Sequence, residues 1–451
     1  MVETRPRSLA LFLALAAAIP PAAGAVAGVA DLPGFVRSAL ATDETVARAQ
    51  SEVRRAGADV RLARSALLPR LSLDGTWTRY QDDLAWDVGD GQSIVIRPLE
   101  DWNWNADLTQ TLFAGLRDWR ARDLAGVRAE AARYDRLTAR LDLAVRVAQA
   151  FYDLLAARRT VKVRDAAVAQ SEAQLRVARR RFDVGEVASA DVLRWQARVA
   201  EDRRALVRAK GLARLAARRL ARLCGTEPPG DLTVPPPVKA PAGEPEALIA
   251  TALGRRPAMR SLDRMLEAAG LRVRIEKGAW LPQLDAHLQY FRQRSTFPSA
   301  DWLSFSLTLH VPVYDGGLTA ARVARAREDE AQADLAVSAL AKRIADEVDT
   351  ARIALETAEA SLKAAVQGRD AAREAHRQTE RAYRAGEATA TDLLEASAAL
   401  SDAEAAVVLA RWQRELQAIA LRRAVGMEPV PGVTLLPETE AGTGQNPEED
   451  R

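Results

Sequence analysis

The chain has 451 residues, of which 64 are Lys or Arg and 61 are Asp or Glu, so the formal net charge is only +3. This balance, without basic runs interleaved with aromatic residues, gives no support to a nucleic-acid partner. The single cysteine, Cys224, cannot form an intrachain disulfide, so the fold must be stable without one.

The N-terminus has the pattern of a secretory signal peptide. Arg5 and Arg7 precede an apolar run from Leu9 to Ile19, and small residues follow through Ala23-Gly24-Ala25. That run is too short to span a bilayer, so we predict a cleaved signal over residues 1–25 and export of the chain. No later stretch reaches 18 uninterrupted apolar residues, which predicts no transmembrane helix.

The rest of the sequence is one unit built twice. Gly185 and Gly386 lie 201 positions apart (386 − 185), and the same offset relates Gly115 to Gly316. A repeat that long without insertion or deletion indicates one structural unit in two copies. The expected domain plan is a first repeat at 26–229, a Pro/Gly linker at 230–244, a second repeat at 245–430 and a disordered C-terminal tail at 431–451.

Each copy opens with a helical pattern and continues with two strands. The first helical pattern runs from about Pro33 to Leu68, and its counterpart runs from about Glu246 to Leu281. Strict alternation of apolar and polar residues then predicts two-faced strands. The alternating runs begin at Leu71, Trp102, Leu284 and Leu303.

Two structures fit this alternation. A soluble pair of hairpins would place one face on a core, whereas membrane barrel strands are about 10 residues long with an apolar lipid face. The signal peptide and the aromatic residues near the strand ends favour the membrane strands. Four strands cannot close a barrel in lipid, so several chains would have to share it. The segments Gln81–Glu100 and Arg294–Asp301 carry Gly, Pro or charge and are expected to be loops.

Two long helical hairpins complete the copies. No proline interrupts residues 99–227 or 313–428, and Leu116–Phe182 alone would span about 100 Å as a helix. Hydrophobic residues such as Val147 and Leu154 recur every seven positions along these arms. Sustained heptads predict antiparallel coiled-coil hairpins, and their high charge content predicts that they extend into water.

The sequence carries no pattern typical of an enzyme. His287, His310 and His376 lie far apart and have no cysteine partner, so their spacing matches no zinc site. A glycine-rich phosphate loop and a nucleophile elbow are also missing. We therefore expect a protein without catalytic residues, cofactor or metal.

The order of elements and several motifs resemble the TolC-like outer-membrane efflux proteins, or outer membrane factors, over essentially the whole mature chain. The motifs are Leu68–Leu71, Leu281–Leu284, Val313–Gly317 and the glycine turns at Gly185 and Gly386. The resemblance implies a mainly α fold with a membrane β component, in which a trimer forms a twelve-stranded barrel and a periplasmic helical tunnel. It also implies a passive outer membrane channel of tripartite efflux or type I secretion, with a periplasmic adaptor (membrane fusion protein) and an inner-membrane pump of the RND or ABC type.

The resemblance further implies a gate at the periplasmic helix tips. Asp392 and Glu395 match an acidic pair that rings the constriction, and Asp191 and Tyr383 match residues that tie neighbouring hairpins closed. Independently of the resemblance, Asp392 and Glu395 are i and i+3 on one helical face, so three copies would place six carboxylates in a cation-favouring ring. The alternative is that Thr389–Asp392 is only a capping box.

The turns at the tips are expected to contact the adaptor. The residues concerned are Gly185, Glu186, Gly386 and Glu387. A basic gate residue that the resemblance predicts is replaced by Ala388, so the sequence departs from the family pattern there. Two other functions compete with the channel. A periplasmic adaptor would show one hairpin flanked by β-rich modules, and a coiled-coil scaffold would need neither the signal peptide nor the strands.

Overall fold

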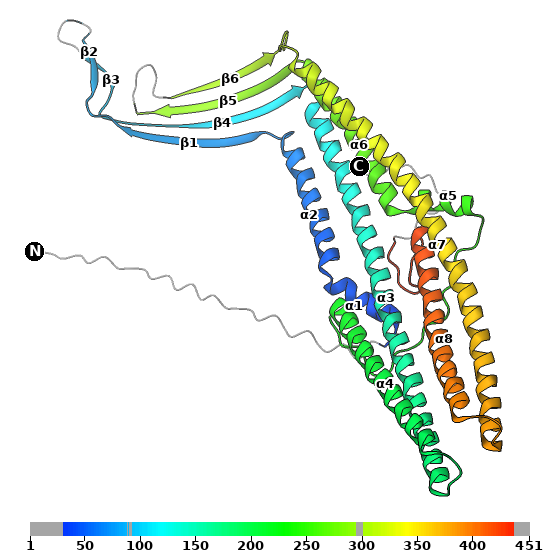
Figure 1. Cartoon of the computed structure of the whole chain (residues 1–451). Coiled ribbons are helices and arrows are strands. Elements are labelled where there is room, and N and C mark those ends of the chain that lie inside the picture. Colours follow the sequence, from blue (N-terminus) through cyan, green and yellow to red (C-terminus); the bar gives the residue numbers. More distant parts are fainter. Residues whose placement is uncertain (1–29, 88, 90–92, 295–300, 437–451) are drawn as a thin grey trace, which may run out of the picture.

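The computed structural model describes residues 30–87, 89, 93–294 and 301–436, so the predicted signal peptide lies outside the described residues. A β-sheet projects from one end of a body of long helices, and short helices flank that body along its length (Figure 1). The first copy contains α1 (Leu32–Thr42), α2 (Glu44–Ser65), β1 (Arg70–Arg79), β2 (Leu84–Asp87), β3 (Ser93–Arg97), β4 (Glu100–Ala114), α3 (Arg117–Asp183) and α4 (Ser189–Cys224). The second contains α5 (Pro245–Arg255), α6 (Pro257–Lys277), the 3-10 turn η1 (Gly278–Trp280), β5 (Gln283–Gln293), β6 (Asp301–His310), α7 (Leu318–Ala385) and α8 (Ala390–Ala424).

Each copy begins with two short helices rather than one. Asp43 follows α1 and caps α2, because its carboxylate accepts hydrogen bonds from the backbone N–H groups of Thr45 and Val46. In the second copy Pro257 begins α6, and the residue before a proline avoids the helical conformation, so α5 ends at Arg255. The prediction of continuous helices over 33–68 and 246–281 was therefore wrong at these breaks.

The four main strands form one antiparallel sheet in the order β1-β4-β5-β6. Pairing of β4 with β5 joins the two copies, because β4 closes the first strand pair and β5 opens the second. Strands β1 and β6 are the outer strands, and each has a neighbour on one side only within the described residues. The sheet therefore stays open in a single chain.

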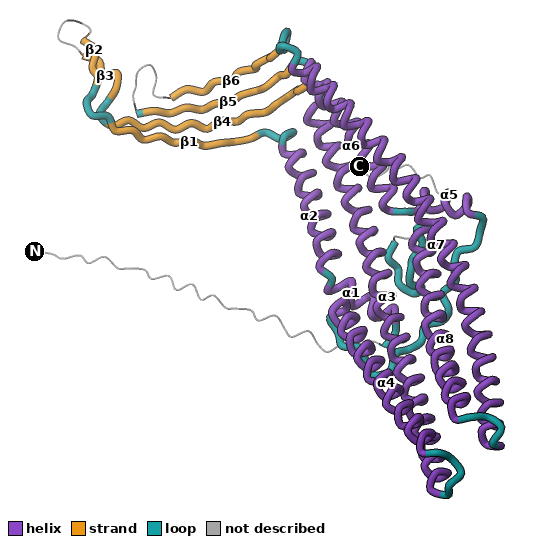
Figure 2. The backbone as a smooth tube through the Cα atoms, in the orientation of Figure 1, coloured by secondary structure: helices purple, strands orange, loops and turns teal. Residues whose placement is uncertain are grey.

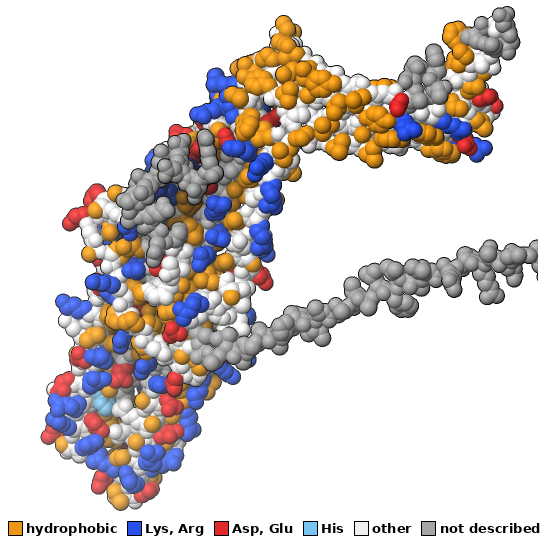
Figure 3. Space-filling model, turned by 180° about the vertical axis from the view of Figure 1, so that it is seen from behind, with side chains coloured by type: hydrophobic (Ala, Val, Ile, Leu, Met, Phe, Trp, Pro, Cys, Tyr) orange, Lys and Arg blue, Asp and Glu red, His pale blue; other side chains and the backbone are white. Residues whose placement is uncertain are grey.

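The sheet has one apolar face and one polar face, as the alternation predicted. One row across all four strands reads Leu73, Ala106, Tyr290, Leu303, and the adjacent row reads Ser72, Asp107, Gln289, Ser304. The apolar side chains are not covered by another layer of the described chain, since Phe305 and Leu73 are 65% and 73% exposed. Figure 3 shows hydrophobic side chains gathered over the sheet, while charges of both signs are spread over the helices.

The predicted loop between the first two strands was wrong in part. Within Gln81–Glu100 the structure places β2 and β3, which pair as a small antiparallel hairpin of their own. Three consecutive β-branched residues, Ile94, Val95 and Ile96, explain why this segment adopts strand geometry. The second predicted loop falls mostly on residues 295–300, which lie outside the described residues.

The long helices pair as the heptads predicted, α3 with α4 and α7 with α8, each across a short turn (Figure 2). They reach 67 residues in α3 and 68 in α7. Val147 and Leu154 are fully buried in the heptad seam. Among the described residues, every helix is too short or too polar to span a bilayer.

The largest core lies at mid-length, where α1, the linker and the C-terminal segment pack on the long helices. Phe35, Phe151, Tyr152 and Trp412 form a chain of ring contacts with centroids 5.6 to 5.8 Å apart. Val433 and Leu435 are buried in the same core. The predicted disordered tail is therefore wrong for residues 431–436, because their apolar side chains are packed, and its remainder lies outside the described residues.

Two glycines bring the sheet close to the helices. Gly115, between β4 and α3, has a φ of 63°, and a Cβ placed there would lie 2.1 Å from the carbonyl oxygen of Gly278. A Cβ on Gly278 would lie 2.6 Å from the carbonyl oxygen of Gly115. The equivalent residue of the second copy, Gly316, has a φ of 66°, but a Cβ on it would have no described atom within 4 Å. Of these two equivalent glycines, only Gly115 therefore has described backbone atoms close to an added Cβ.

Candidate gate at the helix tips

Two glycine turns close the helical hairpins at the end far from the sheet (Figure 1). After α3, Gly185 has a φ of 79° and its N–H donates to the carbonyl oxygen of Phe182 at 2.9 Å. After α7, Gly386 has a φ of 82° and its N–H donates to the carbonyl oxygen of Tyr383 at 3.3 Å. Both glycines therefore have the left-handed conformation, and each ends a long helix without the strain that a Cβ would bring.

The acidic residue after each glycine is exposed at its tip. Glu186 forms an ion pair with Arg181 at 3.2 Å between Oε2 and Nε. The backbone N–H of Glu387 donates to the carbonyl oxygen of Ala382 at 2.9 Å, and its side chain is exposed to solvent. Both carboxylates are placed where a docking protein could reach them, and contact with an adaptor stays a prediction.

Asp392 completes a capping box at the start of α8. The carboxylate accepts a hydrogen bond from the backbone N–H of Thr389 at 2.8 Å, and the Thr389 hydroxyl accepts one from the N–H of Asp392 at 3.2 Å. The Thr389 hydroxyl also donates to the Asp392 carboxylate at 2.7 Å, and the two bonds that this carboxylate accepts, the backbone one first, lower the pKa of Asp392. The capping alternative is therefore present in the structure. It also keeps the carboxylate ionised, as a charged ring would require.

Glu395 lies one turn further along α8. Its side chain is exposed, and within the described residues it has no hydrogen bond or ion pair. Leu393, between the two acidic residues, is fully buried and fixes the rotation of the helix. Asp392 and Glu395 thus share an exposed side of α8, as their spacing predicted.

The structure does not join Asp191 to Tyr383 within one chain. Asp191, in the first turn of α4, forms an ion pair with Arg194 at 2.8 Å. Tyr383 is 6% exposed, its hydroxyl is buried without a hydrogen-bond partner in the described part of the chain, and the guanidinium of Arg181 lies 5.4 Å from its ring centroid. A closing tether between these two residues stays a prediction.

An apolar cluster that the sequence reasoning missed holds the two tips together. Trp195 on α4 is 1% exposed and packs with Tyr383 on α7 and Leu393 on α8. The smaller residues Ala178 and Ala390 complete the cluster. The sequence did carry a signal for this cluster. Trp195 lies close to the glycine turn of the first copy and Tyr383 close to that of the second, and such aromatic residues favour packing between the hairpins.

His376 makes a second contact between the hairpins that the sequence did not predict. It is 8% exposed, and its Nε2 lies 2.8 Å from Nε2 of Gln170 on α3 and 3.1 Å from Oγ of Ser397 on α8. The contacts make it a buried, hydrogen-bonded link between three long helices. No group of His, Cys, Asp and Glu side chains in the described residues is arranged to hold a metal ion.

Comparison with known proteins decides the family. Residues 35–226 and 248–427 match the family profile described as outer membrane efflux protein, so both copies of the repeat are covered. The chain belongs to the outer membrane efflux protein family. It is an outer membrane protein whose helical part lies in the periplasm. The family match does not favour the periplasmic adaptor that competed with this assignment.

Individual proteins are also similar to this chain, two of them over most of its length. The efflux protein BepC of Brucella suis is 27% identical over 58% of this chain, and the alignment spans 59% of BepC. OpmQ of Pseudomonas putida, a pyoverdine export outer membrane protein, is 26% identical over 88% of this chain and 86% of its own length. The solved structure of VceC, an outer membrane protein of Vibrio cholerae, superposes with a TM-score of 0.73 at 17% identity, over 88% of this chain and 97% of VceC. This structural likeness supports the fold.

Proposed function

We propose that this outer membrane efflux protein is a passive exit channel built from three copies of the chain. The observation that carries the proposal is the open four-stranded sheet with an exposed apolar face. In lipid, backbone groups along an unpaired strand edge cost several kcal/mol each, so only a closed barrel is stable. Three copies joined between β1 and β6 would supply twelve strands, with the apolar face toward lipid and the polar face toward the lumen.

The channel would work with partners that supply its energy. A passive pore moves cargo only down a gradient, so export against a gradient depends on another protein. The family and the helical length support an adaptor in the periplasm and an inner-membrane pump of the RND or ABC type as partners. The exposed turns with Glu186 and Glu387 are the contact points that we propose for the adaptor. OpmQ, named for export of pyoverdine, favours a small organic cargo over a polypeptide for this chain.

The tips would form the gate of this channel. Three copies of Asp392 and Glu395 around one axis would place six carboxylates in a ring. Such a ring attracts cations, and it attracts divalent cations more strongly than monovalent ones. Asp191 and Tyr383 would help to hold the closed state through contacts between neighbouring hairpins. The hydroxyl of Tyr383 is buried and has no hydrogen-bond partner among the described residues, so such a contact requires the tip to rearrange.

Removal of the ring charge should weaken divalent-cation block of single pores in planar bilayers. In the double variant Asp392→Asn with Glu395→Gln, the half-blocking concentration should rise about tenfold, because every copy loses two charges at the constriction. A matched control is Glu186→Gln with Glu387→Gln, which removes as many tip charges from the turns. Thr389→Ala removes the cap and keeps the charge, so it should leave the block unchanged. Unaltered block in the first variant would refute the ring.

A further inference from the structure

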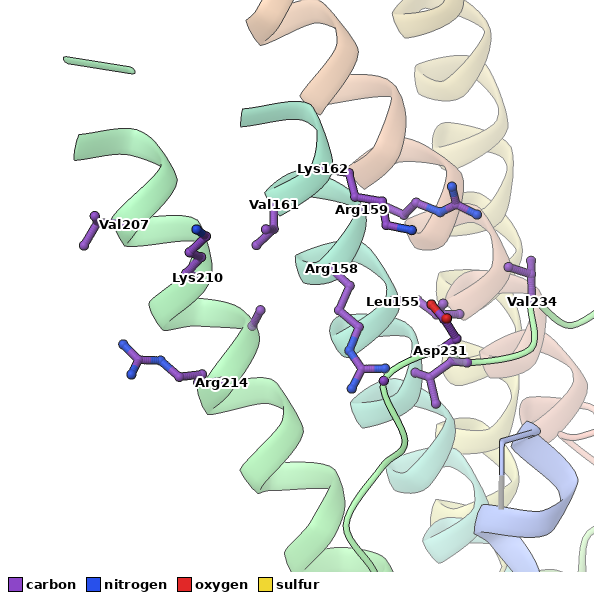
Figure 4. Close-up of a pocket in the computed structure, with 13 residues that line it drawn as sticks. Leu155, Arg158, Arg159, Val161, Lys162, Val207, Lys210, Arg214, Asp231 and Val234 are labelled. Carbon is purple, nitrogen blue, oxygen red and sulfur yellow. The ribbon is translucent and has the colours of Figure 1, made fainter. Parts of the chain in front are cut away.

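A cavity of about 790 Å³ lies between α3, α4 and the linker, away from the tips (Figure 4). Five cationic side chains line it, and Asp231 on the linker is the one acidic residue among its lining residues. The cations are Arg158, Arg159, Lys162, Lys210 and Arg214. We propose that this cavity binds an amphipathic organic anion, with an apolar body and one carboxylate, sulfonate or phosphate head.

The charges of the cavity are not neutralised by the protein. Within the described residues, none of the five cations forms an ion pair or hydrogen bond, either with Asp231 or with any other side chain. Elsewhere on α4 several arginines have acidic partners, as Arg198 does with Asp202 at 2.9 Å and Arg204 with Glu201 at 2.7 Å. Unpaired cations that gather around one hollow repel each other, so an anion bound there would be stabilised by several of them at once.

Arg158 provides a donor for such an anion. Its Nη1 atom is buried and has no hydrogen-bond partner in the part of the chain that the structure describes. Burial lowers the pKa of Arg158, and the nearby charge of Asp231 opposes that shift without forming an ion pair. A buried donor without an acceptor is costly, because it has lost water and gained nothing in exchange. An anionic oxygen would satisfy it once the guanidinium turns toward the cavity, because Nη1 has almost no contact with solvent in the single chain.

The rest of the lining is apolar, which sets the class of ligand. Leu155 and Val161 come from α3, Val207 comes from α4, and Leu232 and Val234 come from the linker. Val207 is 68% exposed, so apolar surface at the mouth is left open to solvent. The volume lies in the range of sites for drug-sized molecules, about 300–1,000 Å³. An inorganic ion would use the cations and leave this surface exposed, whereas an amphipathic anion would cover both.

The proposal can be tested without any measurement of transport, so its failure would be independent of the channel function. The probe is naphthalene-1-sulfonate, titrated calorimetrically into the full-length protein in lipid nanodiscs, with empty nanodiscs as the blank. We expect one site per chain and an affinity that falls with added salt, since exposed charges are screened. The uncharged analogue 1-naphthylmethanol should bind about tenfold more weakly or worse, because it lacks the charge-assisted hydrogen bond.

Substitutions locate the site. Arg158→Gln with Lys210→Gln should weaken binding about tenfold or more, because two charge-assisted contacts are lost. The matched control, Arg176→Gln with Lys363→Gln, removes two exposed cations that lie outside the cavity and should bind as the unaltered protein does. Circular dichroism melts verify folding. If the first variant melts early, Arg214→Gln, at an exposed position, replaces it and should still weaken binding.

A competition experiment distinguishes a lipid-like amphiphile from a free aromatic anion as the source of the head group. Displacement of the probe by dodecyl phosphate, but only weakly by inorganic phosphate, supports a lipid-like amphiphile. Displacement by neither, with retained selectivity over 1-naphthylmethanol, supports a free aromatic anion. Equal binding of the unaltered protein and the cavity variants would overturn the proposal. Equal binding of the uncharged analogue, or displacement by inorganic phosphate as strong as by dodecyl phosphate, would also overturn it.

Discussion

Substitution of Gly115 by alanine should destabilise the protein severely, by about 3 kcal/mol or more. A non-glycine residue at a φ of 63° is strained by about 1–3 kcal/mol. The added Cβ would also lie 2.1 Å from the carbonyl oxygen of Gly278, which belongs to the backbone and cannot rotate away. The junction between β4, α3 and η1 would have to move apart. Thermal melts followed by circular dichroism at 222 nm should show an early transition.

The repeat supplies the control for this prediction. Gly316 occupies the equivalent position with almost the same φ, 66°, but a Cβ there would meet open space. Gly316→Ala should therefore cost only the backbone strain of about 1–3 kcal/mol, without the added clash. Equal melting temperatures for the two variants would show that the close approach to Gly278 does not limit stability.

Substitution of Phe305 by arginine should prevent stable insertion into the outer membrane. Phe305 lies mid-strand on the apolar face of β6 and is 65% exposed in the single chain. In the proposed barrel it faces lipid, where an arginine near the bilayer midplane costs about 2–4 kcal/mol per chain. Three copies would multiply that cost. Outer membrane fractions should contain much less heat-resistant oligomer than those of the unaltered protein.

The adjacent residue tests whether the face matters rather than the added charge. Ser306 points to the opposite, polar side of the same strand, as its pairing with His287 shows. Ser306→Arg should leave the amount of inserted oligomer nearly unchanged, because the lumen is wet. Comparable losses in both variants would contradict the assignment of the two faces.

Much of the fold could be predicted from periodicity. Strict alternation from Leu71 and Leu303 predicted both the strands and the face that each side chain occupies. Heptads through Val147 and Leu154 predicted the buried seam of α3. Both predictions are reliable because a period fixes which side of an element is buried, and the doubled sequence provides each pattern twice.

What periodicity could not show are features that depend on contacts far along the chain. The break at Asp43 follows from one capping carboxylate, and a capping residue does not interrupt a helical pattern. The packing of Val433 and Leu435 depends on a core assembled from both copies, so their polar surroundings in the sequence predicted disorder. The same limit applies to the candidate sites. Trp195 connects the two tips only once the hairpins have folded, and Arg158 becomes part of a cationic cavity only then.

The proposed channel depends most on closure of the sheet between copies. Native mass spectrometry of the detergent-extracted protein, recorded on samples that conduct in planar bilayers, measures the number of chains directly. We predict a particle of three chains, which supplies twelve strands and pairs every β1 with a β6 of another copy. Conducting particles that contain one chain or two would contradict the account, because four or eight strands of this sheet would then be sufficient to form the pore.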